Sequence, residues 1–331
     1  MKNLDEILRA TCVGEIFTKK DIKEQYHEYL KKYHPDLHNG DERYSEATQK
    51  IIKFYDKATE LLKEGKWEEK DTIYIKMPNG KTIVARYSFK QDFELGTMYV
   101  CRTKVIYVIN EENKKFFDNI KIDGFLSGLN PSLKENFNIF IPKILYKFKS
   151  ENKYVVVFEK NYDLIPLSAF IDFFNGKIPD KQAAWIITKL SNLCCLFKVS
   201  KFVHCGIDMN SIFVSPEMHS VVIFGGWWYS KSVGDKLIGT SSFVFNCMPI
   251  YSKTKKEARE DIDLQSVKKI GKTICEWNTN LPKPFKDWLN SGSSTNGILE
   301  YGNWEKTLKD SYGERKFIKV NFDYNKFYKT P

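Results

Sequence analysis

The sequence predicts an α+β protein in which a small, all-helical N-terminal region precedes a larger domain of two lobes. Apolar residues within residues 18–64 recur every three to four positions, as they do in amphipathic helices. Residues 72–158 then hold short runs of β-branched and aromatic residues between turn residues, which is typical of strands. From residue 164 the helical spacing returns, so a strand-rich lobe is followed by a helical lobe.

The N-terminal region is predicted to form two antiparallel helices joined by a polar loop. The first covers residues 18–32, where Thr18 followed by Asp21 predicts a capping box. The second runs roughly over residues 44–64, and a shorter helix is expected over residues 4–9. The predicted apolar stripes are Ile22, Tyr26 and Leu30 on the first long helix, and Ile51, Tyr55, Ala58 and Leu62 on the second.

The loop between the long helices carries a short motif with distinct chemistry, Lys31-Lys32-Tyr33-His34-Pro35-Asp36. Pro35 fixes its own φ and biases His34 toward extended backbone, so the loop is expected to be stiff. Asp36 offers a carboxylate suited to a bidentate pair with an arginine of a partner. A mostly basic face is expected opposite the apolar stripe of the first helix, formed by Lys20, Lys23, His27 and Lys31.

A His-Pro-Asp loop behind a basic helix and ahead of a second amphipathic helix resembles the J-domain of the DnaJ-like co-chaperones over roughly residues 1–68. The resemblance implies binding to a heat-shock chaperone ATPase of the seventy-kilodalton class and stimulation of its ATP hydrolysis. The alternative is a helical hairpin whose loop merely uses good turn residues. The chaperone-binding residues that the resemblance implies are His34, Pro35, Asp36, Lys20, Lys23, His27, Lys31 and Lys32.

Composition bounds the class of protein. The 331 residues are enough for two domains, and 42% hydrophobic with 28% charged residues is usual for a soluble globular chain. No apolar run reaches the roughly 20 residues that span a bilayer, and the first residues lack a signal-peptide core, so a cytoplasmic protein without membrane contact is expected. The seven cysteines include no Cys-x-x-Cys pair, which favours buried thiols over disulfides or zinc.

The net charge of +10 is unevenly distributed. Residues 1–70 contain 14 Lys and Arg against 15 Asp and Glu, whereas residues 71–331 contain 38 against 27. A basic second region permits contact with nucleic acid or with an acidic partner, although the requirement for solubility explains the charge equally well.

The strand-rich lobe is predicted element by element from alternation and turn chemistry. A hairpin is expected over residues 72–88, with Pro78-Asn79-Gly80 as its turn. The remaining predictions are strands over residues 97–102 and 104–109, a helix over 111–120, a loop over 123–131, and two buried strands over 144–148 and 154–158.

The helical lobe begins with a long amphipathic helix. Asp180 is expected to cap it, and it runs to about Val199. Its predicted buried stripe consists of Ala183, Ile187, Leu190, Cys194 and Phe197.

The segment that follows, residues 203–214, resembles the catalytic loop of protein kinases: an apolar residue and a His, seven further residues, and a short apolar strand. Residues 221–226 resemble the strand and turn that carry the kinase metal-binding Asp, and Asp261 to Leu264 the start of the central helix. The resemblance covers about residues 71–310. It implies that Asp261 braces the catalytic-loop backbone and that His204 is the structural histidine.

The residues that kinase chemistry requires are replaced in this chain. Kinases need a catalytic Asp, a metal-binding Asn, a second metal-binding Asp and a strand Lys. These four positions correspond here to Gly206, Ser211, Gly225 (or Phe224) and Val108, and Gly96 is all that is kept of the phosphate-covering loop. Without a base or metal ligands, transition-state charge would go unstabilised. The resemblance therefore implies a pseudokinase without cofactor or metal, which binds a protein client.

Two alternatives from other classes remain open. One is an atypical phosphotransferase that uses other residues or Asp208, which lies two residues past the expected base. The other is a nucleic-acid-associated protein that uses the basic second region, with a stacking platform at Trp227-Trp228-Tyr229 or a basic and aromatic tail over residues 315–329. Core packing of the three aromatic residues, a terminal strand in the tail, a satisfied core role for His204 and a turn role for His219 are the structural alternatives.

Overall fold

The computed structural model describes residues 1–122, 129, 131, 135, 137, 140–314 and 318–328. The chain divides into two compact units. The N-terminal unit consists of Met1–Ile75 and Thr82–Tyr87, and the C-terminal unit of Lys76–Lys81 and Ser88–Pro331. The division crosses a β-hairpin, and the boundary predicted near residue 70 stays a prediction.

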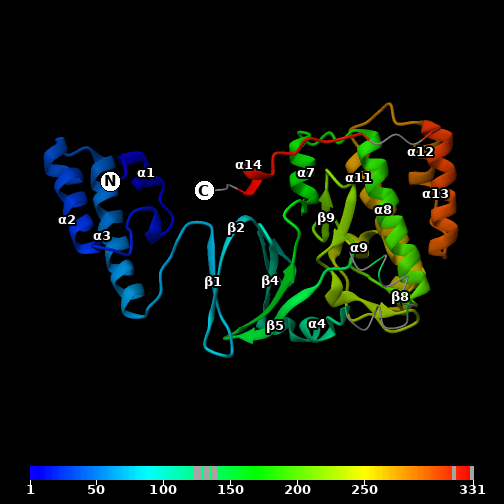
Figure 1. Cartoon of the computed structure of the whole chain (residues 1–331), viewed down its shortest axis with the longest axis horizontal. Coiled ribbons are helices and arrows are strands. Elements are labelled where there is room, and N and C mark those ends of the chain that lie inside the picture. Colours follow the sequence, from blue (N-terminus) through cyan, green and yellow to red (C-terminus); the bar gives the residue numbers. More distant parts are fainter. Residues whose placement is uncertain are drawn as a thin grey trace. The chain divides into compact units, whose positions relative to one another are not determined.

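The N-terminal unit is built from short and long helices around one apolar core. Helix α3 contacts both α1 and α2, and Figure 1 shows α2 and α3 side by side. Ile7, Val13, Ile51 and Ala58 are fully buried between them. Asn3 and Glu6 form a reciprocal capping box at the start of α1. The elements are α1 (Leu4–Arg9), η1 (Val13–Glu15), α2 (Ile22–Tyr33), η2 (Pro35–His38) and α3 (Glu42–Lys63).

Two details predicted for these helices are wrong. Asp21 does precede α2, but its backbone is left-handed and its side chain makes no capping bond. Thr18 bonds Gln25 instead, so there is no Thr18–Asp21 capping box. The buried stripe of α2 consists of Ile22, Tyr29 and Tyr33, whereas the predicted Tyr26 and Leu30 are only half-buried. On α3, the predicted stripe residue Leu62 is exposed.

The strand-rich lobe is an antiparallel sheet with strand order β1-β2-β3-β4-β6-β5. Its interior strand β6 is buried along five consecutive residues, as predicted. Strand β5 was predicted to be buried, but it is partly exposed because it forms one edge of the sheet. The strands are β1 (Thr72–Lys76), β2 (Thr82–Phe93), β3 (Gly96–Cys101), β4 (Lys104–Asn110), β5 (Ile144–Ser150) and β6 (Lys153–Glu159).

The helix predicted over residues 111–120 is present as a 3-10 turn, η3 (Glu111–Asn113), followed by α4 (Lys114–Asn119). Most of the loop predicted over residues 123–131 lies outside the described residues.

The helical lobe follows the sheet along the chain, as the sequence predicts (Figure 1). Helix α8 packs against α11 and α13, and the five residues predicted for its stripe are all buried. The elements of this lobe are β7 (Ile165–Pro166), α7 (Leu167–Phe173), α8 (Asp180–Val199), β8 (Phe202–Val203), β9 (Ile212–Ser215), β10 (Ser220–Ile223), η4 (Trp227–Tyr229), β11 (Lys231–Ser232), α9 (Ser242–Cys247), α10 (Ile250–Lys255), α11 (Glu260–Cys275), α12 (Lys283–Asn290), α13 (Gly297–Tyr312) and α14 (Tyr324–Tyr328).

Two further predictions about this lobe need correction. Asp180 is the first residue of α8 and makes no capping bond; its carboxylate accepts hydrogen bonds from Lys181 N–H and the Tyr312 hydroxyl. The tail was expected to end in a strand, but the part that is described ends in helix α14. Residues 315–317 and 329 of the tail lie outside the described residues.

A buried lysine joins this tail to the connection between the two lobes. Lys160 follows β6, and its side chain is almost entirely buried. Its ammonium group donates to the carbonyls of Arg102, Asn161 and Leu164 and to the hydroxyl of Tyr328 at 2.7–3.0 Å. Burial lowers the pKa of Lys160 to about 7. Tyr328 on α14 is thus part of the core of the C-terminal unit.

All seven cysteines are free thiols. Among the described residues, no cluster of three or more His, Cys, Asp and Glu is arranged to hold a metal ion, and no helix is long and apolar enough to cross a bilayer.

Candidate functional sites

The His-Pro-Asp loop leaves the end of α2 in the conformation that its proline requires. His34 follows the last residue of the helix with φ −62° and ψ 130°, the extended backbone expected before Pro35. The Nδ1 atom of His34 accepts a hydrogen bond from Asp36 N–H at 3.3 Å and lies 3.4 Å from a carboxylate oxygen of Asp36. The imidazole thus fixes the backbone that presents Asp36.

The helices on either side hold this loop in place. The Thr48 hydroxyl of α3 donates to the carbonyl of Tyr33 at 2.7 Å. The ring of His38 stacks on Tyr44 at 3.6 Å between centroids. The side chain of Asp36 is 84% exposed, and His34 is the only basic group within 4 Å of it among the described residues. The loop therefore presents a carboxylate that is rigidly placed and open to a partner.

The predicted basic face is exposed but of mixed charge. Lys20, Lys23, His27, Lys31 and Lys32 are all exposed, and none of them forms an ion pair with a described residue. Lys20 precedes the first residue of α2, so four of the five belong to the helix itself. The exposed Glu24 and Glu28 lie on the same helix. The face can attract an acidic surface, with less charge than the lysines alone suggest.

In the C-terminal unit, two of the positions compared with kinase residues, Ser211 and Gly225, line one cleft, and Gly206 packs against Gly226, which also lines it. Gly225 N–H points to the carbonyl of Ser211 at 3.3 Å. A Cβ atom added to Gly225 would lie 3.0 Å from Ser211 Cα, and one added to Gly206 would lie 2.7 Å from Gly226 Cα. The backbone has closed around these glycines. A side chain at Gly206 would require the backbone at Gly226 to move, and a side chain at Gly225 would crowd Ser211.

The strand residue that faces this cleft is Tyr107, not Val108. Alternate residues of β4 point to opposite faces of the sheet. Val105, Tyr107 and Ile109 are buried in the core of the unit, whereas Val108 is partly exposed and does not line the cleft. Val108, which was predicted to correspond to the kinase strand Lys, therefore lies one residue of strand register away from the residue that faces the cleft.

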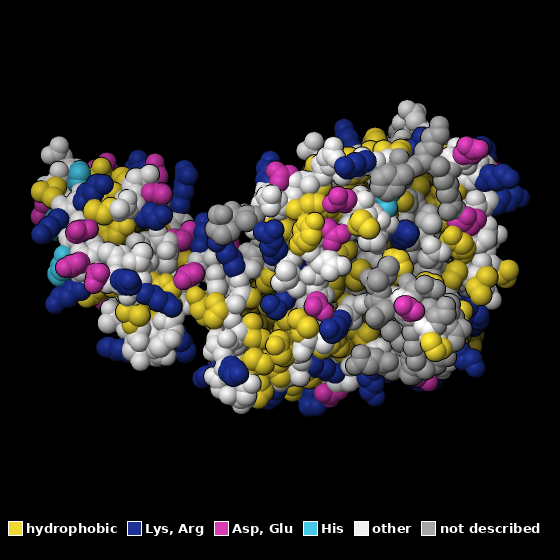
Figure 2. Space-filling model, in the orientation of Figure 1, with side chains coloured by type: hydrophobic (Ala, Val, Ile, Leu, Met, Phe, Trp, Pro, Cys, Tyr) yellow, Lys and Arg dark blue, Asp and Glu magenta, His cyan; other side chains and the backbone are white. Residues whose placement is uncertain are grey.

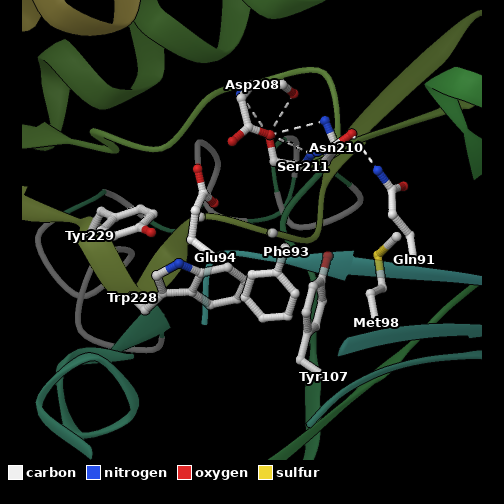
Figure 3. A pocket seen from close by; sticks show the side chains of 12 residues that line it. Gln91, Phe93, Glu94, Met98, Tyr107, Asp208, Asn210, Ser211, Trp228 and Tyr229 are labelled. Atoms are coloured by element: carbon white, nitrogen blue, oxygen red, sulfur yellow. Dashed lines mark hydrogen bonds between the residues drawn. The ribbon is translucent and has the colours of Figure 1, made fainter. Parts of the chain in front are cut away.

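Aromatic side chains fill the cleft (Figure 3). Phe93 lies 5.5 Å from Tyr107 and 5.0 Å from Trp228, and Tyr107 lies 5.0 Å from Trp228, between ring centroids. The remaining cavity has a volume of about 20 Å³, which is room for roughly one water molecule. Sites for small ligands are typically about 300–1,000 Å³. As it stands, the cleft is much smaller than a typical small-ligand site.

Asp208 lines the cleft, but its carboxylate is used by its own turn. It accepts hydrogen bonds from Asn210 N–H and Ser211 N–H at 2.9 Å each. Burial raises its pKa, as it does that of Tyr107, whose hydroxyl has no hydrogen-bond partner among the described residues. Asn210 is held in turn by Gln91 at 2.7 Å. The Asp208 carboxylate therefore supports its own turn, and among the described residues no group of three or more His, Cys, Asp and Glu is arranged there to hold a metal ion.

The residue that braces the loop is Asp263, and the prediction of Asp261 was wrong. The carboxylate of Asp263 accepts hydrogen bonds from His204 N–H at 2.7 Å and Cys205 N–H at 2.9 Å. Asp261 instead lies 3.4 Å from the side chain of Arg259. Burial raises the pKa of Asp263 to about 7 although both N–H bonds oppose the shift.

His204 is a core residue, but its ring is not satisfied as predicted. It is fully buried, packs edge-on against Trp227 at 4.6 Å, and neither ring nitrogen has a hydrogen-bond partner among the described residues. Burial lowers its pKa to about 3. His219 lies in a turn with φ 45° and stacks on Trp185, as expected for a turn residue.

The aromatic run Trp227-Trp228-Tyr229 is buried, so it packs in the core and offers no open stacking platform. On the face of the C-terminal unit shown in Figure 2, lysine and arginine side chains are scattered among apolar and acidic ones.

Sequence reasoning missed Phe93, Gln91, Tyr107 and Asp263. The alternation of side chains along a strand could have identified Tyr107, because it lies two residues from both Val105 and Ile109 and so shares their buried face.

Comparisons with known proteins add little to this geometry. No family model matches the chain, and no curated protein matches it. Among solved structures, the chain is similar to the structure of vaccinia related kinase 3, with a TM-score of 0.47 and 12% identity over 73% of this chain and 92% of that one.

Proposed function

We propose that this chain is a J-domain co-chaperone, which binds a heat-shock chaperone ATPase of the seventy-kilodalton class and stimulates its ATP hydrolysis. The observation that carries the proposal is Asp36, an exposed carboxylate held by Pro35 and His34 at the end of a helix with exposed lysines. Asp36 would pair with an arginine of the chaperone, and Lys23 and Lys31 would attract its acidic surface.

Single-turnover ATP hydrolysis by a cytosolic chaperone of this class tests the proposal. The full native chain should accelerate hydrolysis, and Asp36→Asn should lose at least about tenfold of the effect, because truncating one partner of a charge pair at an interface costs about 2 kcal/mol or more. Asp56→Asn, an exposed change on α3, is the matched control and should act like the native chain. Equal stimulation by native chain and Asp36→Asn would refute the role of this carboxylate.

For the C-terminal unit, we propose a protein-kinase-like fold that binds a partner protein and transfers no phosphate. The fold is supported by the order of a sheet lobe and a helical lobe. The absence of phosphate transfer is supported by the close backbone contacts at Gly206 and Gly225, which leave little room for a side chain, and by the aromatic side chains that fill the cleft. Catalysis would lack an acceptor for the hydroxyl proton and the charges that stabilise a transferring phosphoryl group.

The opposing proposal, a phosphotransferase that uses Asp208, makes a different prediction for nucleotide binding. A nucleotide that binds only the folded state stabilises it, by about 2.7 kcal/mol at one hundred times its dissociation constant. Thermal unfolding of the full chain with ATP and Mg²⁺ should show no such shift, whereas an active kinase run alongside should. A dose-dependent rise in melting temperature that Tyr107→Trp abolishes would favour the opposing proposal.

A further inference from the structure

A groove with a volume of about 540 Å³ lies beside helices α9 and α10 of the C-terminal unit. It is formed by residues 237–242 and by the two helices, and Ser242 N–H donates to Glu94, a residue that lines the filled cleft. Its size falls in the range of sites that accept a peptide side chain or a small ligand. The residues on which its chemistry depends are Leu237, Phe245, Met248, Ser252, Lys253 and Lys256.

A serine with an unpartnered hydroxyl lies in the wall of this groove. Ser252 lines the groove, has no exposed surface, and its hydroxyl makes no hydrogen bond to any described residue. An unsatisfied buried polar group costs about 1–3 kcal/mol. The wall of the groove therefore carries an unsatisfied polar group at Ser252.

Large apolar side chains stand exposed around the groove. Phe245 is 54% exposed, Ile250 81% and Tyr251 48%, all within seven consecutive residues. Isolated exposed apolar residues are ordinary, but a cluster beside a concave surface is typical of a binding site. This part of the unit therefore offers an apolar anchor point.

The charges around the groove are predominantly positive. The segments that form the groove carry four lysines, and the only acidic residues beside them in these segments are Asp235 and Glu257. None of the four makes an ion pair with a described residue; they are Lys236, Lys253, Lys255 and Lys256. The ammonium group of Lys253 lies 5.0 Å from the centroid of the Phe245 ring. Apolar and cationic groups thus lie within one side-chain length of each other.

We propose that this groove binds an extended acidic segment of a partner protein, with an apolar side chain against Phe245 and carboxylates at Lys253 and Lys256. The inference rests on the proposed partner-binding role of the C-terminal unit and names the chemistry of the partner. It needs neither nucleotide nor the filled cleft.

Fluorescence anisotropy with the full chain tests the proposal. The probe is a labelled ten-residue peptide in which Glu alternates with Leu and Phe, and its counterpart carries Lys in place of Glu. The native chain should bind the acidic peptide, and the double variant Lys253→Glu/Lys256→Glu should bind it at least tenfold more weakly. Lys286→Glu/Lys306→Glu, an equal charge change at exposed positions on α12 and α13, is the matched control and should bind like the native chain.

A second variant, Phe245→Ser, separates the apolar contribution from the charge and should weaken binding while leaving its salt dependence unchanged. Equal weakening of peptide binding by both double variants would mean that net charge alone attracts the peptide, and it would refute binding at the groove. Tighter binding of a single-stranded oligonucleotide than of the peptide, lost in the groove variant, would also overturn it. The groove variants should keep full chaperone stimulation, so failure here is distinguishable from failure of the Asp36 experiment.

Discussion

The His-Pro-Asp loop and the filled cleft place their chemistry in opposite ways. The loop is contiguous in sequence and exposes its carboxylate at Asp36. The cleft is assembled from segments far apart in the chain, such as Gln91 and Asn210, which are 119 residues apart, and buried aromatic side chains such as Tyr107 and Trp228 fill it. The comparison teaches that the loop can change its chemistry at little cost to folding, whereas any change at the cleft alters the stability of the unit.

Replacing Asp263 should have the largest effect on stability. Asp263→Ala leaves the buried N–H groups of His204 and Cys205 without acceptors. At about 1–3 kcal/mol for each group, the C-terminal unit should lose about 2–6 kcal/mol. Urea unfolding followed by tryptophan fluorescence measures this, because six of the seven tryptophans belong to that unit. A loss as large for the neighbouring Asp261→Ala would show that Asp263 is not the brace.

The pH dependence of stability should come next in size. His204 has a folded-state pKa of about 3, compared with an ordinary value of 6.5. Below about pH 6.5, His204 is therefore protonated in the unfolded state but not in the folded state. This contribution to stability is present above pH 6.5 and is lost as the pH falls toward 3, by up to about 1.4 kcal/mol for each pH unit.

Asp263 has the opposite effect on stability. Because its folded-state pKa is raised to about 7, the folded state binds the proton before the unfolded state does, so this group favours folding as the pH falls from 7 toward 4. The comparison of native chain and His204→Gln isolates the histidine. The difference in unfolding free energy between them should change with pH between 6.5 and 4. A constant difference would show that His204 accepts a proton in the folded state.

The smallest effect on stability is expected at the loop. Asp36→Asn should change the free energy of unfolding by less than about 0.5 kcal/mol, because the side chain is exposed and away from any buried contact. Calorimetry of the variant used in the ATPase experiment checks this. A larger loss would mean that Asp36 supports the fold, and the proposed difference between loop and cleft would fail.

Sequence patterns were sufficient where a structural feature is local. Helix α1 has the bounds predicted for it, and α8 ends at the predicted Val199, because periodic apolar residues specify a helix from within its own segment. The same holds for the hairpin turn at Pro78-Asn79-Gly80, whose residues suit few other conformations.

Sequence patterns failed where the orientation of a side chain decides the outcome. Asp261 and Asp263 are two residues apart on α11, so their side chains point about 200° apart around the helix, and only one of them reaches the loop. Val108 and Tyr107 differ in the same way across a strand. A sequence motif specifies the spacing of residues, but the neighbouring helices and strands determine which of two nearby positions faces inward.

The bond between Lys160 and Tyr328 has a consequence for synthesis of the protein. The two residues are 168 positions apart, so the ribosome makes the lysine long before the tyrosine that accepts its hydrogen bond. At about 5–20 residues per second, roughly 8–34 s pass between them. During that interval the nascent C-terminal unit holds an ammonium group with no Tyr328 beside it, so its final packing is completed only after α14 has been synthesised.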